Sequence, residues 1–60
     1  MMVTGSYNRV NGHFKMHSPT FPYQSTVYIG YSLDGMKRKY RQDFNLKYKR
    51  IDWIILGMGD

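Results

Sequence analysis

The sequence predicts an α+β fold: a small antiparallel or mixed sheet of three to four strands, ordered β-β-β-α-β, with one helix packed on one face. Three observations support this prediction. An Asn-Gly pair separates two alternating segments near the N-terminus, an amphipathic stretch follows the serine at position 32, and strand-like residues dominate 26–31 and 50–56. Two layers around one core let these elements bury their apolar sides. With 60 residues, we expect a single domain over 1–60.

A β-hairpin is predicted around the Asn-Gly pair at 11–12, because this dipeptide is preferred in two-residue type I′ turns, where both residues need positive φ. Such a turn would pair Val10 with His13 and Tyr7 with Met16. The alternation then sorts the side chains into an apolar face, with Val3, Tyr7, Phe14 and Met16, and a polar face, with Thr4, Ser6, Asn8, His13, Lys15 and His17.

A loop and a third strand are predicted next. The stretch SPTFPYQS contains two prolines, which cannot donate to a strand ladder, and is therefore expected to be a loop. Residues 26–31 are rich in β-branched and aromatic side chains, which favour a strand. Alternation along this strand would place Val27, Ile29 and Tyr31 on one face and Tyr28 on the other.

One helix is predicted over residues 33–44. Ser32 is a favourable N-cap, and Asp34 places a negative charge in the first turn, where it interacts favourably with the helix dipole. Asn45 is expected to end the helix. At 100° per residue, one narrow apolar stripe is expected to face the core and comprises Leu33, Met36, Tyr40 and Phe44.

The last predicted strand, over residues 50–56, is apolar on both faces. Ile54 and Leu56 point away from the helix if Ile51, Trp53 and Ile55 face it. A strand that is apolar on both faces needs cover on both. We expect Tyr28 to join Ile54 and Leu56 on the open face. Two alternatives remain: the loop with Phe21 and Tyr23 covers them as a lid, or they form a protein-contact patch or homodimer interface.

Basic residues are concentrated in the second half of the chain. The net charge is +5, and residues 37–50 contain most of the lysines and arginines with Asp43 as the one acid. A basic block of this kind is typical of a protein that binds a polyanion such as nucleic acid, although lysines also keep small domains soluble. We expect Lys39 to pair with Asp43. The predicted nucleic-acid contacts are Lys37, Arg38, Arg41, Lys47, Lys49 and Arg50, with Lys15 and Tyr48 as additions.

Few residues could support catalysis or metal binding. The chain has no glutamate or cysteine, and its four aspartates are scattered, so we expect no enzyme and no cofactor. His13 and His17 fall short of the three or four ligands of a zinc site. No apolar run approaches the roughly 20 residues that cross a bilayer, so no membrane partner is expected. The lack of cysteine fits a reducing cytoplasm, where we expect the protein to be located.

The stretch YIGYSLDGMKRKYRQDF, a strand leading into a capped helix, resembles small accessory proteins of Gram-positive bacteriophages and mobile elements. The order of three strands and a helix is also similar to the arm-type DNA-binding domains of transposon integrases and to the plant AP2 domain, which read the major groove with the sheet. A fourth strand and a basic helix depart from that pattern. The basic block predicts a non-enzymatic binding protein whose partner is nucleic acid. The alternative is a protein-interaction module that binds and modulates a host protein through Tyr28, Ile54 and Leu56.

Overall fold

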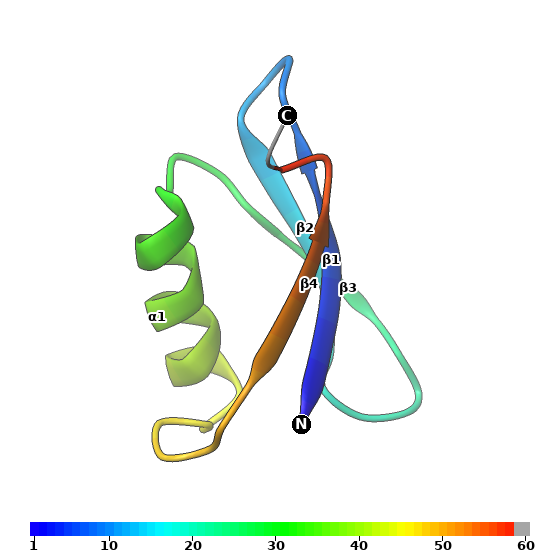
Figure 1. Cartoon of the computed structure of the whole chain (residues 1–60), viewed down its shortest axis with the longest axis vertical. Coiled ribbons are helices and arrows are strands. Elements are labelled where there is room, and N and C mark those ends of the chain that lie inside the picture. The colour runs from blue at the N-terminus through cyan, green and yellow to red at the C-terminus, as the bar shows by residue number, and fades with distance from the viewer. Residues whose placement is uncertain (59–60) are drawn as a thin grey trace.

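The computed structural model describes residues 1–58, which form a four-stranded sheet and one helix. The elements are β1 (Met2–Asn8), β2 (His13–His17), β3 (Ser25–Tyr28), α1 (Leu33–Asp43) and β4 (Asp52–Leu56). The strand order is β3-β2-β1-β4, and β4 runs parallel to β1 whereas the other pairs are antiparallel. The helix packs on one face of the sheet and leaves the other face open (Figure 1). The predicted α+β fold is therefore confirmed, with a mixed sheet.

The β1–β2 hairpin forms with a register different from the predicted one. Asn8 pairs with His13 and Tyr7 with Phe14, so the predicted pairing of Tyr7 with Met16 is wrong by two residues. Because side chains alternate with a period of two, this even shift leaves every residue on its predicted face. Phe14 and Met16 are accordingly buried.

A four-residue loop over 9–12 accounts for the shift. Gly12 has a positive φ of 73°, but Asn11 does not share it, so the two-residue type I′ turn and the pairing of Val10 with His13 are not formed. Asn side chains instead organise the loop. Asn8 Oδ1 accepts from the Val10 N–H at 2.9 Å, and Asn11 Oδ1 accepts from the His13 N–H at 3.0 Å.

The third strand is shorter than predicted, and the face that contains Tyr28 turns toward the helix. Tyr28 is buried, whereas Val27 and Ile29 are exposed, so these residues do lie on opposite faces, but it is Tyr28 that faces the helix and not the open side as predicted. The pairing of Tyr28 with Phe14 fixes this orientation, because directly opposed residues share a face. The Tyr28 hydroxyl donates to Asp43 Oδ2 at 3.0 Å, and burial together with this contact raises the pKa of Tyr28.

The helix begins where the sequence predicts and ends one residue earlier. Ser32 caps it, and its Oγ accepts from the Gly35 N–H at 3.1 Å. At the other end Asn45 adopts a left-handed φ of 56°, and the Leu46 N–H donates to the Arg41 carbonyl at 2.8 Å. This is the Schellman pattern, and it confirms Asn45 as the stop.

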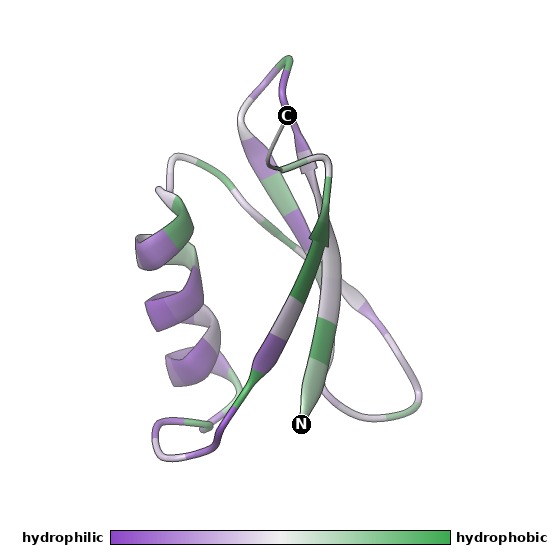
Figure 2. Ribbon diagram, viewed as in Figure 1, coloured by the Kyte–Doolittle hydropathy of each residue, from purple (hydrophilic) through white to green (hydrophobic). Residues whose placement is uncertain are grey.

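The core lies between α1 and the sheet, and Tyr40 lies at its centre. The Tyr40 ring packs edge-on against Trp53 at 5.4 Å between centroids, and its hydroxyl donates to the His17 carbonyl. Burial raises the pKa of Tyr40 to about 12. Hydrophilic residues lie on the side of α1 that faces away from the sheet (Figure 2). The buried core side chains are Val3, Phe14, Met16, Tyr28, Met36, Tyr40, Leu46 and Ile51.

The last strand presents apolar side chains to both faces, as predicted. Trp53 and Ile55 pack against the core, whereas Ile54 is 43% exposed and Leu56 is 70% exposed. Phe21, in the loop between β2 and β3, is itself exposed. Within residues 1–58, the lid alternative is therefore not formed over Leu56.

Candidate nucleic-acid interface

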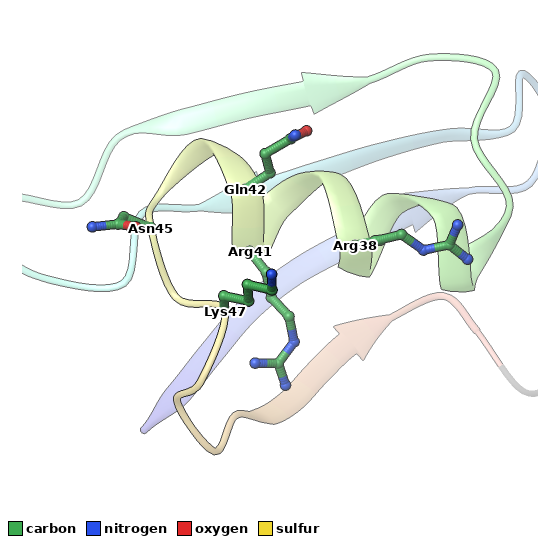
Figure 3. A pocket seen from close by; sticks show the side chains of 5 residues that line it. All are labelled: Arg38, Arg41, Gln42, Asn45 and Lys47. Atoms are coloured by element: carbon green, nitrogen blue, oxygen red, sulfur yellow. The ribbon is translucent and has the colours of Figure 1, made fainter.

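The predicted phosphate contacts gather on α1 and on the loop 46–50 that follows it. The left-handed turn at Asn45 reverses the chain and returns this loop along the end of the helix. Arg38, Arg41 and Lys47 line one depression of about 370 Å³, together with Gln42 and Asn45. Figure 3 shows Arg41 and Lys47 beside each other, with Arg38 farther along the helix. We define the basic surface as Lys37, Arg38, Arg41, Lys47, Lys49 and Arg50.

Arg41 has a structural role that the sequence does not reveal. Its Nη1 donates to the Leu46 carbonyl at 2.9 Å and to the Lys49 carbonyl at 2.6 Å. These two bonds tie the loop to the last turn of α1. Arg41 therefore positions the loop that contains Lys47, and it also adds positive charge to the depression.

Two further helix lysines have local partners. Lys37 Nζ lies 5.7 Å from the centroid of the Trp53 ring, a cation–π contact toward β4. Lys39 Nζ lies 2.8 Å from Asp43 Oδ1, as expected. The hydrogen bond from Lys39 lowers the pKa of Asp43, and the same bond raises the pKa of Lys39. Within residues 1–58 this is the one salt bridge, so no carboxylate there forms an ion pair with a cation of the basic surface.

The tip of the loop combines a cation with an aromatic ring. Tyr48 is 91% exposed, and Lys47 Nζ lies 5.5 Å from the centroid of its ring. An exposed ring beside a cation can stack on a nucleobase while the cation meets a phosphate. Gln42 and Asn45 add amide groups to the depression, and we did not predict their part in it from the sequence.

Lys15 does not join the basic surface. It lies between Ser6 and Val27 in the sheet, on the face opposite α1. The prediction of Lys15 as an additional contact therefore concerns a separate surface, here called the open sheet face. The apolar members of that face are Met2, Val27, Ile54 and Leu56, all of them exposed. Tyr28 is buried on the helix side, so its predicted place among them is wrong.

The two histidines lie on the open sheet face as part of β2. His17 Nδ1 is 3.0 Å from Thr4 Oγ1. Among residues 1–58, no three side chains of His, Cys, Asp or Glu gather as metal ligands. In the same part of the chain, no helix has the length and apolar character needed to cross a membrane.

Comparison with known proteins adds no relative. No family model, curated protein or solved structure matches this chain. The chemistry of the interface therefore rests on the residues described above: a cluster of cations, two amides and one exposed aromatic ring. Such groups bind anions and stack on flat rings.

Proposed function

We propose that this chain is a small basic non-enzymatic binding protein, of bacteriophage or mobile-element type, that contacts nucleic-acid phosphates in the cytoplasm. The supporting observation is that α1 and a single loop hold the basic surface, with Arg38, Arg41 and Lys47 around one depression. Guanidinium and ammonium groups form charge-assisted hydrogen bonds with phosphate oxygens. Phosphate contacts position a protein on nucleic acid without selecting a sequence.

Exposure of the charges favours this function. Arg38, Lys47, Lys49 and Arg50 are exposed and lie close together in the chain. Binding of a polyanion to such a surface releases condensed counterions, which supplies much of the affinity at low salt. The Lys47–Tyr48 pair adds a stacking platform, so single-stranded regions are favourable targets.

Fluorescence anisotropy with labelled duplex DNA, single-stranded DNA and RNA tests this proposal. The variant Arg38→Gln/Lys47→Gln removes two charges from the basic surface, whereas the control Arg9→Gln/Lys15→Gln removes two exposed charges elsewhere. Exposed ion pairs are worth up to about 1 kcal/mol each, so we expect the first variant to bind roughly tenfold more weakly. The control should bind nearly as well as the wild type. Equal losses in both variants, or no binding at micromolar protein, would contradict the proposal.

A host protein is the alternative partner, because the open sheet face exposes Ile54 and Leu56. Exposed apolar side chains can form the centre of a protein interface, while basic residues elsewhere on the surface steer association. Pull-down from a bacterial lysate, with and without nuclease, separates the two functions. Loss of bound material after nuclease supports nucleic acid, whereas a discrete protein that stays bound and is lost with Leu56→Lys supports the alternative.

A further inference from the structure

We propose that two copies of this chain pair through β4, edge to edge and antiparallel, so that two sheets join into one. In the strand order β3-β2-β1-β4, β4 is an edge, and within residues 1–58 no strand lies on its outer side. An edge strand offers unpaired N–H and C=O groups to another chain. This interface is distinct from the basic surface, and its existence does not depend on nucleic-acid binding.

The backbone of β4 identifies the groups that face outward. The Asp52 N–H donates to the Met1 carbonyl at 2.8 Å, and β4 continues beside β1 in parallel register, with Trp53 opposite Val3. In a parallel pair, alternate residues of a strand direct both their N–H and C=O groups to the same neighbour. Asp52, Ile54 and Leu56 therefore bond to β1. The N–H and C=O groups of the two residues between them point away from β1.

These two outward residues, Trp53 and Ile55, suit pairing with a second copy. Antiparallel pairing about a two-fold axis at Ile54 places Trp53 opposite Ile55 of the second copy, and Ile55 opposite Trp53. Both outward residues of each copy then exchange their N–H and C=O groups with the partner, which satisfies them all. The pair Trp53–Ile55 also brings an aromatic ring against a β-branched side chain, a favourable cross-strand contact.

The side chains of β4 favour association at this edge. Ile54 meets its own copy on the axis, and Leu56 lies beside it on the open sheet face. Residues 53–56 contain no charge or proline, two usual means of blocking an edge strand, and the one charge of β4 is Asp52 at its start. The opposite edge, β3, has four residues and follows a loop with two prolines, so it is less suited to pairing.

The charge distribution also favours an antiparallel arrangement. The basic loop 46–50 comes directly before β4, so antiparallel pairing puts the loops of the two copies at opposite ends of the joined strands. A five-residue strand is about 17 Å long, which exceeds the Debye length of about 8 Å at physiological salt. The two helices lie on the same side of the joined sheet, which would offer two basic surfaces to one polyanion.

Sedimentation equilibrium without nucleic acid, from micromolar to millimolar protein, tests this proposal. The mass should rise from 7.2 kDa toward twice that value. Ile54→Lys places two like charges on the axis and should keep the protein monomeric. Val27→Lys is the matched control, because Val27 is similarly exposed on the same face but belongs to β3, and it should associate like the wild type.

Amide hydrogen exchange of the wild type gives a second readout that needs no variant. The N–H groups of Trp53 and Ile55 should exchange more slowly as the protein concentration rises, while exposed loop amides should not change. A monomer at all concentrations, an equal effect of both lysine variants, or a dimer without concentration-dependent protection of Trp53 and Ile55 would overturn the proposal. Each outcome is independent of whether the basic surface binds nucleic acid.

Discussion

Replacing Tyr40 with phenylalanine should test how the helix is held to the sheet. Tyr40 is fully buried, and its hydroxyl donates to the His17 carbonyl. Tyr40→Phe removes this hydrogen bond and leaves the carbonyl without that donor, at a cost of about 1.5 kcal/mol. For a domain of this size, 1 kcal/mol shifts Tm by roughly 4–8 °C, so we expect Tm to fall by about 6–12 °C at pH 7.

The same substitution should have almost no effect at pH 11. The pKa of Tyr40 is raised from 10.0 to about 12 in the folded protein. The stability that its neutral hydroxyl contributes is fully present below pH 10 and is lost as pH rises from 10 toward 12. At pH 11 the wild type has lost about 1.4 kcal/mol of this contribution, which Tyr40→Phe cannot lose. Burial and the hydrogen bond to Asp43 are the main causes of the raised pKa of Tyr28, and both remain in Tyr40→Phe, so most of the effect of Tyr28 cancels in the difference.

Urea unfolding of both proteins at pH 7 and pH 11 measures this effect. The difference in free energy of unfolding should shrink from about 1.5 kcal/mol to near zero. Tyr48→Phe is the control, because Tyr48 is exposed and its loss should leave the free energy of unfolding unchanged at both pH values. An equal difference at the two pH values would refute the reasoning, because Tyr40 would then ionise alike in the folded and unfolded chains.

Three further substitutions test other contacts. Gly5→Ala would place a Cβ 2.4 Å from Met16 Sδ, and we expect a loss of about 2 kcal/mol in urea unfolding. Ser32→Ala removes the N-cap oxygen and should lower the free energy of unfolding by about 1 kcal/mol, with reduced helical signal in circular dichroism. Because Lys39 lowers the pKa of Asp43, the stability from this pair is present at neutral pH and lost as pH falls through that lowered value. Asp43→Asn should therefore lower Tm at pH 7, and this difference from the wild type should shrink as the pH falls into the acid range.

The helix could be predicted because its signals are local. The N-cap oxygen of Ser32 and the left-handed conformation of Asn45 depend on residues within one turn. The apolar alternation of β4 was equally informative, since Ile54 and Leu56 lie on the open sheet face as predicted. Local patterns of this kind are readable without knowledge of the neighbouring elements.

The turn and β3 were harder to predict because competing interactions determine their conformation. Asn8 and Asn11 bond to the loop backbone through their side chains, and this favours four loop residues over the expected two. Four residues of β3 give no clear alternation, and Tyr28 is amphipathic enough for either face. Its pairing with Phe14 and the bond to Asp43 place it in the core. Both contacts come from elements distant in sequence.

The basic surface was predicted as a set of charges, but not as an arrangement. Charge counting found Arg38 and Lys47, which line the depression. It could not show that Lys15 lies apart from the basic surface, because the face that a strand residue occupies depends on where the helix packs. Nor could it show that Arg41 bonds to two loop carbonyls, since these converge only when the chain reverses after Asn45.

The salt dependence of nucleic-acid binding tests the central proposal most directly. Each phosphate neutralised on duplex DNA contributes about −0.9 to the slope of log K against log salt concentration. If most cations of the basic surface contact phosphates, the wild-type slope should be about −4 to −5. Arg38→Gln/Lys47→Gln should reduce its magnitude by about 2, and Arg9→Gln/Lys15→Gln should leave it unchanged. A flat dependence, or the same slope in all three proteins, would contradict a phosphate-binding role for the basic surface.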